Sequence, residues 1–332
     1  MDLDLLDLDL LALDRLRPTG LFTLAEATAT GLHRRDVGRW VRDGVTARVA
    51  PGTFVDAARW QQAEPERQHV LRGMAATMSL QAAAVLSHAP AAALHGLPLL
   101  SPRVDLPGRR LHLTRQSAGP SHVSRHYTLH RRYGADQCAP PIDGVPVVLP
   151  VLAAFGVAEL DGIVAGVVAL DSALHQGKTT LEEAQVWLAR LRRRPGTVVI
   201  RRVIEAADCL SESPLESQAR LVVTALGYRM RLQVVLSTTE GAFVARVDGL
   251  IEELGVVLEV DGRIKYVGDN GTGSVEAVLS EKRRDSAIRD LGYGIVRLDR
   301  LALDEPNQVD RRIQNASQRA DASVRRLPRS GA

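Results

Sequence analysis

Two runs of apolar and β-branched residues in the last third of the chain predict a β-hairpin. Residues 243–251 and 256–260 carry the β-forming side chains, and the four residues between them are mostly polar and end in glycine. Helical patterns precede and follow this hairpin, and a short apolar run closes the region. The predicted elements are a helix opening at Ser213, the hairpin, a helix over residues 274–291 and a final strand at residues 295–298.

Three acidic side chains are predicted to converge on one face of the hairpin. A turn centred on residues 253–254 places Asp248 opposite Glu259, with Cβ atoms roughly 5 Å apart. Asp261 follows Glu259 at the spacing that returns a side chain to the same face. Like charges this close destabilise a sheet unless a cation or strong donors lie between them. A bulge at Gly255 would loosen the cluster without dispersing it.

A divalent metal ion is the natural occupant of such a cluster. Mg²⁺ or Mn²⁺ prefers oxygen ligands, and Mg²⁺ is commonly held by one or two carboxylates together with water and phosphate oxygens. This composition is typical of a phosphodiester-cleaving site. Asp248 and Asp261 each precede a glycine and could instead be ordinary turn residues. That alternative does not account for Glu259, which lies in a strand apolar enough to be buried.

The spacing of these residues resembles the PD-(D/E)XK nuclease superfamily, in the branch of the very-short-patch-repair endonucleases. Asp248 is followed after a ten-residue gap by Glu259-Val260-Asp261-Gly262 and then by Lys265-Tyr266. The resemblance covers residues 211–303. It implies a restriction-endonuclease-like core with the element order αβββαβ and a catalytic role for the acidic cluster.

The same resemblance makes Glu216 and Lys265 candidate catalytic residues. Glu216 on the first helix is expected to approach the metal, although a helix-capping box with Ser213 also explains this acid. The lysine that the superfamily carries two residues after its glutamate is Asp261 here, so Lys265 is the nearest lysine. Arginine is too basic for proton transfer, which favours a chemical role for a lysine in this arginine-rich chain. A surface charge at a strand end is the alternative.

Glu281 and Arg284 lie on the core-facing stripe of the helix predicted over residues 274–291. Both share a helical face with apolar residues. We therefore expect a charged pair near the catalytic site, with Arg284 able to hold a phosphate. An ordinary ion pair at the edge of the stripe is the alternative.

Residues 20–56 predict two short helices, a turn and a two-stranded wing. Thr23 and Glu26 have capping-box spacing at the start of the first helix, and Gly44 closes the second. The pattern resembles the N-terminal winged helix of the AbiEi-type antitoxin family, whose members resemble transcriptional repressors. Contact with another protein is the alternative to contact with DNA. Arginine contacts phosphate and reads guanine, so the expected DNA-binding residues are Arg34, Arg35, Arg39, Arg42 and Arg48.

Residues 57–200 resemble the region that follows the winged helix in the same family. His88 and His95 lie seven residues apart on one helical face. No third ligand is evident from the sequence, so we interpret both as structural or capping histidines. We expect an alanine-rich helix at residues 87–97, strands over residues 103–133, and helices over residues 151–194 that break at Gly162 and Gly177.

Charge and cysteine usage add two expectations. The net charge is only +3, but residues 103–133 carry seven arginines and residues 190–202 carry six. These runs could contact a phosphate backbone, or they could form a solvated face of a chain that uses arginine in place of lysine. Cys138 and Cys209 lack disulfide or metal-site spacing, and we expect both to be buried small apolar groups.

The N-terminal extension and the apolar runs bear on where in the cell the protein is expected, and the C-terminal residues bear on its last element. Residues 1–19 form an acidic and apolar extension in which aspartates interrupt the apolar run, which does not fit a secretory signal. The longest apolar run that we identify, residues 163–174, is too short for a membrane span. We therefore predict a cytoplasmic protein without a membrane segment, and we expect residues 304–332 to form a helical, frayed tail.

Together these patterns predict a mixed α/β protein of several domains that acts as a metal-dependent endonuclease on DNA. The expected parts are a winged helix, an antitoxin-like middle domain and a nuclease-like domain. The main rival is a repressor or type IV antitoxin-like protein whose nuclease fold is retained without activity. A third interpretation is an antitoxin that binds a toxin protein encoded nearby.

Overall fold

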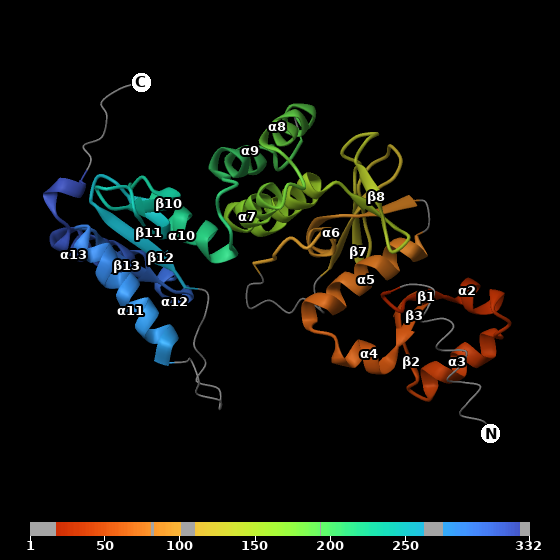
Figure 1. Cartoon of the computed structure of the whole chain (residues 1–332). Helices are drawn as coiled ribbons and strands as arrows, with labels where there is room; N and C mark the ends of the chain where they lie inside the picture. Colours follow the sequence, from red (N-terminus) through yellow and green to blue (C-terminus); the bar gives the residue numbers. More distant parts are fainter. Residues whose placement is uncertain (1–17, 81–82, 101–109, 193, 262–274, 326–332) are drawn as a thin grey trace. The chain divides into compact units, whose positions relative to one another are not determined.

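The computed structural model describes residues 18–80, 83–100, 110–192, 194–261 and 275–325, with the backbone alone over residues 275–278. The chain divides into two compact units, Met1–Glu205 and Ala206–Ala332 (Figure 1). The described residues form twelve α-helices and three β-sheets, so the architecture is mixed α/β. Residues 1–17, Gly262 and Lys265 lie outside the described residues.

The N-terminal unit begins with short helices and a small antiparallel sheet. The capping box at Thr23 is confirmed, since its Oγ1 accepts the Glu26 N–H at 3.1 Å and the Glu26 carboxylate accepts the Thr23 N–H at 2.7 Å. Phe22, Trp40 and Phe54 form the core of this part. Its elements are β1 (Phe22–Thr23), α2 (Leu24–Ala29), α3 (Arg34–Arg42), β2 (Thr46–Ala50) and β3 (Thr53–Asp56), with sheet order β1-β3-β2.

A six-stranded sheet forms the centre of the rest of this unit. Its strand order is β6-β7-β5-β4-β9-β8, with parallel pairing of β5 to β7 and of β4 to β9. The elements are α4 (Ala57–Gln62), α5 (Pro65–Ser79), β4 (Ala84–Leu86), α6 (His88–Leu94), β5 (Leu111–Arg115), β6 (His122–Val123), β7 (Tyr127–His130), β8 (Cys138–Ile142) and β9 (Val145–Val148).

Three helices follow the sheet: α7 (Pro150–His175), α8 (Leu181–Arg190) and α9 (Thr197–Ala206). Both predicted breaks are confirmed, because Gly162 and Gly177 have φ angles of +86° and +65°. α7 is longer than the apolar run expected from the sequence, and its length and composition would suffice to cross a membrane. However, 67% of its most apolar window is buried inside the protein, as in the core helix of a soluble protein.

The C-terminal unit contains a four-stranded sheet of order β10-β11-β12-β13, in which only β12 and β13 run parallel among the described pairs. The predicted hairpin register is confirmed, because Ile251 pairs with Val256 and Gly249 pairs with Leu258. The next step along this register places Asp248 opposite Glu259. The elements are α10 (Pro214–Ala225), β10 (Arg231–Ser237), β11 (Phe243–Ile251), β12 (Val256–Val260), α11 (Val275–Asp290), β13 (Gly294–Leu298), α12 (Arg300–Leu303) and α13 (Pro306–Arg319).

Helices cover both faces of this sheet. α10, α12 and α13 share one hydrophobic core with β12 and β13, whereas Ile288 of α11 packs against side chains of the opposite face. The expectation of a frayed tail is wrong for residues 306–319. Val309 and Ile313 of α13 are fully buried, so this helix belongs to the core.

The expectation that both cysteines are buried is also wrong. Cys138 is half-buried and Cys209 is exposed. Cys138 begins β8, an edge strand of the six-stranded sheet, and an edge position leaves part of a side chain in contact with water. Cys209 lies in the connection between α9 and α10, outside both sheets.

Candidate functional site

A cavity of about 180 Å³ lies over the β11–β12 hairpin in the C-terminal unit. The strands β11 and β12, the helix α11 and the strand β13 all contribute side chains to it. The three carboxylates expected to converge line this one cavity, and so does the arginine expected to hold a phosphate. Its lining residues are Asp248, Glu259, Val260, Asp261, Glu281, Arg284 and Arg297.

Asp248 is half-buried on β11, and its Oδ2 accepts the backbone N–H of Val260 at 2.8 Å. Burial raises the pKa of this carboxyl above its ordinary value, and the negative charge of Glu216 adds to the increase. The Val260 N–H and the positive charge of Arg284 act in the opposite direction. A nearby cation would stabilise the ionised form of this carboxyl, because the positive charge offsets the free-energy cost of burying a negative charge.

Glu259 lines the cavity with only 12% of its side chain exposed. Its Oε2 accepts a hydrogen bond from Nε of Arg297 at 3.2 Å, and its Oε1 lies 3.1 Å from Nη2 of Arg284. Oε1 is buried, and within the described part of the chain it makes no contact with hydrogen-bond geometry. This oxygen of the carboxylate therefore has capacity for another ligand.

Arg297 of β13 is the main participant that sequence reasoning missed. Its guanidinium nitrogens lie 3.2 Å from Oε2 of Glu259, 2.8 Å from Oε1 of Glu281 and 2.8 Å from Oδ1 of Asp285. Burial disfavours its charged form, yet these carboxylates together raise the pKa of Arg297. Glu281 therefore pairs with Arg297, so its expected pairing with Arg284 is wrong. The strands β12 and β13 pair in parallel, with Arg297 beside Glu259. The sequence does not show that these two strands are neighbours, so it could not reveal this contact.

Glu216 is buried at the start of α10, but the full capping box expected there does not form. Ser213 Oγ accepts the Glu216 N–H at 3.2 Å, which is the expected half of the box. The Glu216 carboxylate instead accepts the Glu212 N–H at 3.0 Å and a hydrogen bond from Gln233 Nε2 at 3.0 Å. It is therefore directed toward β10, and it acts on Asp248 through its charge.

Gln233 was also missed by the sequence analysis. It lies in β10 between Leu232 and Val234, which pair with Gly249 and Val247, so the ladder places Gln233 beside Asp248. Its φ of +51° is in the left-handed region, which is strained for a residue other than glycine. Gln233 thus links the acid of α10 to the strand that carries Asp248.

Asp261 is exposed at the rim of the cavity, directly after β12. Its backbone N–H donates to the Leu298 carbonyl at 2.9 Å, which continues the pairing with β13 by one residue. Lys265, the remaining predicted catalytic residue, lies outside the described residues.

The donor set of the cavity suits a hard divalent cation. The carboxylates of Asp248 and Glu259, the rim carboxylate of Asp261 and the Val260 carbonyl are all oxygen donors, as Mg²⁺ and Mn²⁺ prefer. The buried Oε1 of Glu259 agrees with a ligand role, since it has no hydrogen bond to a described residue. Arg284 and Arg297 already supply part of the positive charge that such an ion would bring.

The five arginines expected to contact DNA are all exposed in the N-terminal unit. Four of them lie on α3, whose opposite side buries Val37 and Trp40. Arg39 Nη2 lies 3.4 Å from Oδ1 of Asp36, a solvent-exposed pair that leaves the guanidinium accessible. The helix α3 therefore has a buried apolar side and an exposed basic side.

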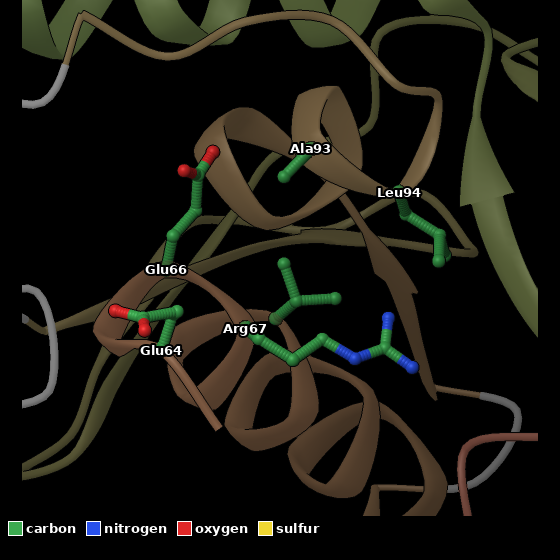
Figure 2. Close-up of a pocket in the computed structure, with 6 residues that line it drawn as sticks. Glu64, Glu66, Arg67, Ala93 and Leu94 are labelled. Atoms are coloured by element: carbon green, nitrogen blue, oxygen red, sulfur yellow. The ribbon is translucent and has the colours of Figure 1, made fainter. Parts of the chain in front are cut away.

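A second hollow, of about 310 Å³, lies between α5 and α6 (Figure 2). The carboxylates of Glu64 and Glu66 lie at one end of it, and the Arg67 guanidinium extends away from them. Burial raises the pKa of Glu66. Both acids belong to the N-terminus of α5, where negative charge is stabilised by the helix dipole, so helix stability accounts for their position.

The interpretation of His95 as a structural residue is confirmed, because its Nε2 lies 2.7 Å from the Val148 carbonyl oxygen. Burial lowers its pKa, which favours the neutral ring.

Comparison of the chain with models of known protein families finds no match, and comparison with curated proteins finds none either. The geometry of the sites themselves is therefore the basis for inferring function.

Proposed function

We propose that the protein is a metal-dependent endonuclease that acts on DNA, with its catalytic site in the cavity over the β11–β12 hairpin. The observation that carries the proposal is the convergence of Asp248, Glu259 and Asp261 on one cavity that also holds two arginines. Carboxylates that bind a divalent cation beside guanidinium groups that bind phosphate are the components of a phosphodiester-cleaving site. The element order of the C-terminal unit, αβββαβ, supports assignment to a restriction-endonuclease-like core.

Each lining residue has a role that follows from its position. Asp248 and Glu259 would hold Mg²⁺ or Mn²⁺ from the two strands, and Asp261 or the Val260 carbonyl would contribute from the rim. The bound ion would polarise the scissile phosphate and lower the pKa of an attacking water. Arg284, whose side chain is 43% exposed, is placed to exchange its contact with Glu259 for a phosphate oxygen. Glu216 would act at longer range, and Lys265 would orient the water.

The N-terminal unit would supply affinity for DNA. The short helices α2 and α3 with the β2–β3 pair support assignment as a winged helix. The exposed arginines on α3 would contact the phosphate backbone and the edges of guanine bases. A DNA substrate would agree with a cytoplasmic protein.

A DNA-binding regulator with an inactive nuclease fold is the second candidate, and one observation favours it. Glu259 contacts both Arg284 and Arg297, so its charge is balanced by the protein itself. A carboxylate balanced in this way requires a metal less than an isolated one does. An antitoxin that binds a toxin protein would be one form of such a regulator.

Nicking of supercoiled plasmid by the full-length protein separates the two candidates. We expect open-circular product in the presence of Mg²⁺ or Mn²⁺ and none in the presence of EDTA. DNA binding by gel shift with no product at any metal concentration would instead support the regulator.

A further inference from the structure

Three histidines from separate segments meet in the N-terminal unit. One ring nitrogen each of His88, His112 and His130 lies within 4.8 Å of the other two. The ring centroids are 4.5 to 5.5 Å apart, with His112 and His130 stacked and His88 tilted against both. His88 is fully buried and the other two are half-buried. Imidazole is the commonest protein ligand for transition metals, so three of them around one point need a chemical explanation.

The six-stranded sheet brings these residues together. His112 of β5 pairs with Thr128 of β7, and Thr114 pairs with His130, so His112 and His130 lie diagonally on one face. His88 begins α6 directly after β4, the other neighbour of β5 in the sheet. The cluster thus joins two strands and a helix N-terminus that lie far apart in the sequence.

The backbone around His88 is shaped to hold its ring in place. His88 has a φ of +58°, a conformation that costs a non-glycine residue about 1 kcal/mol. On α7, a Cβ at Gly156 would lie 2.8 Å from Cγ of His88 and 2.9 Å from its Cα. Only glycine therefore lets α7 approach this closely. Strain and a close contact at the same residue indicate that the ring position is held by the surrounding fold.

Hydrogen bonds indicate which nitrogen of His88 would be available to a ligand. Ser87 Oγ lies 2.7 Å from Nδ1 of His88, and it donates to the His112 carbonyl at 3.4 Å. With its proton directed to that carbonyl, the hydroxyl accepts from Nδ1–H of His88. Nε2 then carries a lone pair, which is the form that binds a metal, and the contact at Nδ1 is the kind that orients metal-binding histidines.

The other contacts lie near the spacing that one small cation requires. Nδ1 of His112 and Nε2 of His130 are hydrogen-bonded at 2.8 Å, and Nε2 of His88 lies 3.8 Å from Oε2 of Glu159. Ligands 2.0–2.1 Å from a tetrahedral Zn²⁺ are about 3.3 Å apart, so a bound ion would replace the hydrogen bond between the two rings and separate their nitrogens by roughly 0.5 Å.

We propose that His88, His112 and His130 form a binding site for a divalent transition-metal ion, with Glu159 as a fourth ligand from α7. Zinc is the ion that this set of three imidazoles and one carboxylate fits best, because zinc accepts nitrogen and oxygen donors in tetrahedral geometry. The ion would tie β5, β7, α6 and α7 together. This site is distinct from the carboxylate cavity of the C-terminal unit and does not depend on the proposed nuclease function.

Metal titration of the full-length chain tests the site directly. The protein is purified without a polyhistidine tag, stripped by dialysis against a chelator, and titrated with Zn²⁺ by calorimetry and with Co²⁺ by visible absorption. We expect one tight equivalent of Zn²⁺, the strong visible bands of four-coordinate Co²⁺, and loss of those bands when Zn²⁺ is added. Absence of a stoichiometric site would overturn the proposal.

Single substitutions test which histidines of the N-terminal unit bind the ion. His130→Gln should weaken zinc binding at least tenfold, whereas His122→Gln and His126→Gln, which change exposed histidines nearby, should leave it unchanged. Glu259→Ala should also keep the site, which separates it from the hairpin cavity. If His130→Gln does not fold, X-ray absorption on the zinc-loaded wild-type protein decides. Scattering from three imidazoles supports the site, and a spectrum without imidazole scattering overturns it.

Discussion

The carboxylate cavity of the C-terminal unit and the histidine cluster of the N-terminal unit stabilise polar groups in opposite ways. The cavity is partly open to solvent and balances its acids with Arg284 and Arg297. The cluster lies deeper, and its imidazoles can remain neutral, so burial costs them less. The cavity therefore stabilises its carboxylates by pairing them with arginines. The histidine cluster avoids much of the cost of burial because neutral imidazoles carry no charge.

This difference also separates the ions that each region would bind. Oxygen donors with negative charge favour hard cations such as Mg²⁺ and Mn²⁺, whereas imidazoles favour zinc and its neighbours. Each site lies within its own compact unit. The two sites should therefore respond independently to substitution and to metal.

Gly156→Ala should affect the N-terminal unit alone and should have the largest effect on stability. Its new Cβ would lie 2.8 Å from Cγ of His88. We expect a loss of about 1–3 kcal/mol in the free energy of unfolding from this overpacking, which exceeds the gain of at most about 1 kcal/mol from replacing a helical glycine. Chemical denaturation and zinc calorimetry measure both consequences.

Gly38→Ala in α3 is the matched control, because a Cβ there meets nothing within 4 Å. We expect it to be neutral or to stabilise the protein by roughly 0.5 kcal/mol. Equal effects of the two substitutions would show that the ring of His88 is not held by close packing against α7.

Replacing Arg34 and Arg35 together by alanine should weaken DNA binding without changing either of the proposed metal sites. We expect affinity to fall about tenfold at moderate salt and the dependence of affinity on salt to become shallower, because fewer phosphates are neutralised. Arg67→Ala, on the exposed side of α5, changes the charge in the same unit and should have a smaller effect. Fluorescence anisotropy at several salt concentrations measures both, and equal losses would remove α3 as the DNA-contacting helix.

Asp248→Asn should have the smallest effect on stability in this series. It should stabilise the folded protein slightly while it reduces nicking activity. Burial raises the folded-state pKa of this acid above 3.8. Its contribution to stability is therefore complete below that pH and is lost as the pH rises through the folded-state value. Asparagine avoids this loss, so we expect a gain of about 0.5 kcal/mol at neutral pH, discounted for screening by water because Asp248 is only half-buried.

The gain from Asp248→Asn should shrink toward pH 4, where aspartic acid itself becomes neutral. Urea denaturation at several pH values measures this dependence. Glu240→Gln changes an exposed acid in the turn between β10 and β11 and should show no such trend. A loss of stability in Asp248→Asn at neutral pH would contradict the account of this carboxyl.

The carboxylate cavity could be predicted in large part because its acids are close together in the sequence. A hairpin with a short turn fixes its own register, so Asp248 and Glu259 could be placed opposite each other from their spacing alone. Arg297 could not be placed, because its contact with Glu259 requires the order of two parallel strands separated by a helix.

The histidine cluster could not be predicted for the same reason. His88 was paired with His95 by helical spacing, yet His95 binds the Val148 carbonyl and the partners of His88 lie on β5 and β7. Local patterning also misjudged α13, whose burial depends on the sheet beneath it. Periodicity identifies elements well, but it does not identify which elements become neighbours.

The central claim is that the acids of the hairpin carry out phosphodiester cleavage, and nicking of supercoiled plasmid by Glu259→Ala tests it most directly. Glu240→Ala removes an exposed acid from the neighbouring turn of the same unit and is the matched control. With both variants folded by circular dichroism, we expect Glu259→Ala to lose at least about 100-fold in Mg²⁺-dependent nicking while Glu240→Ala retains it. Nicking by Glu259→Ala at the wild-type rate would contradict the account.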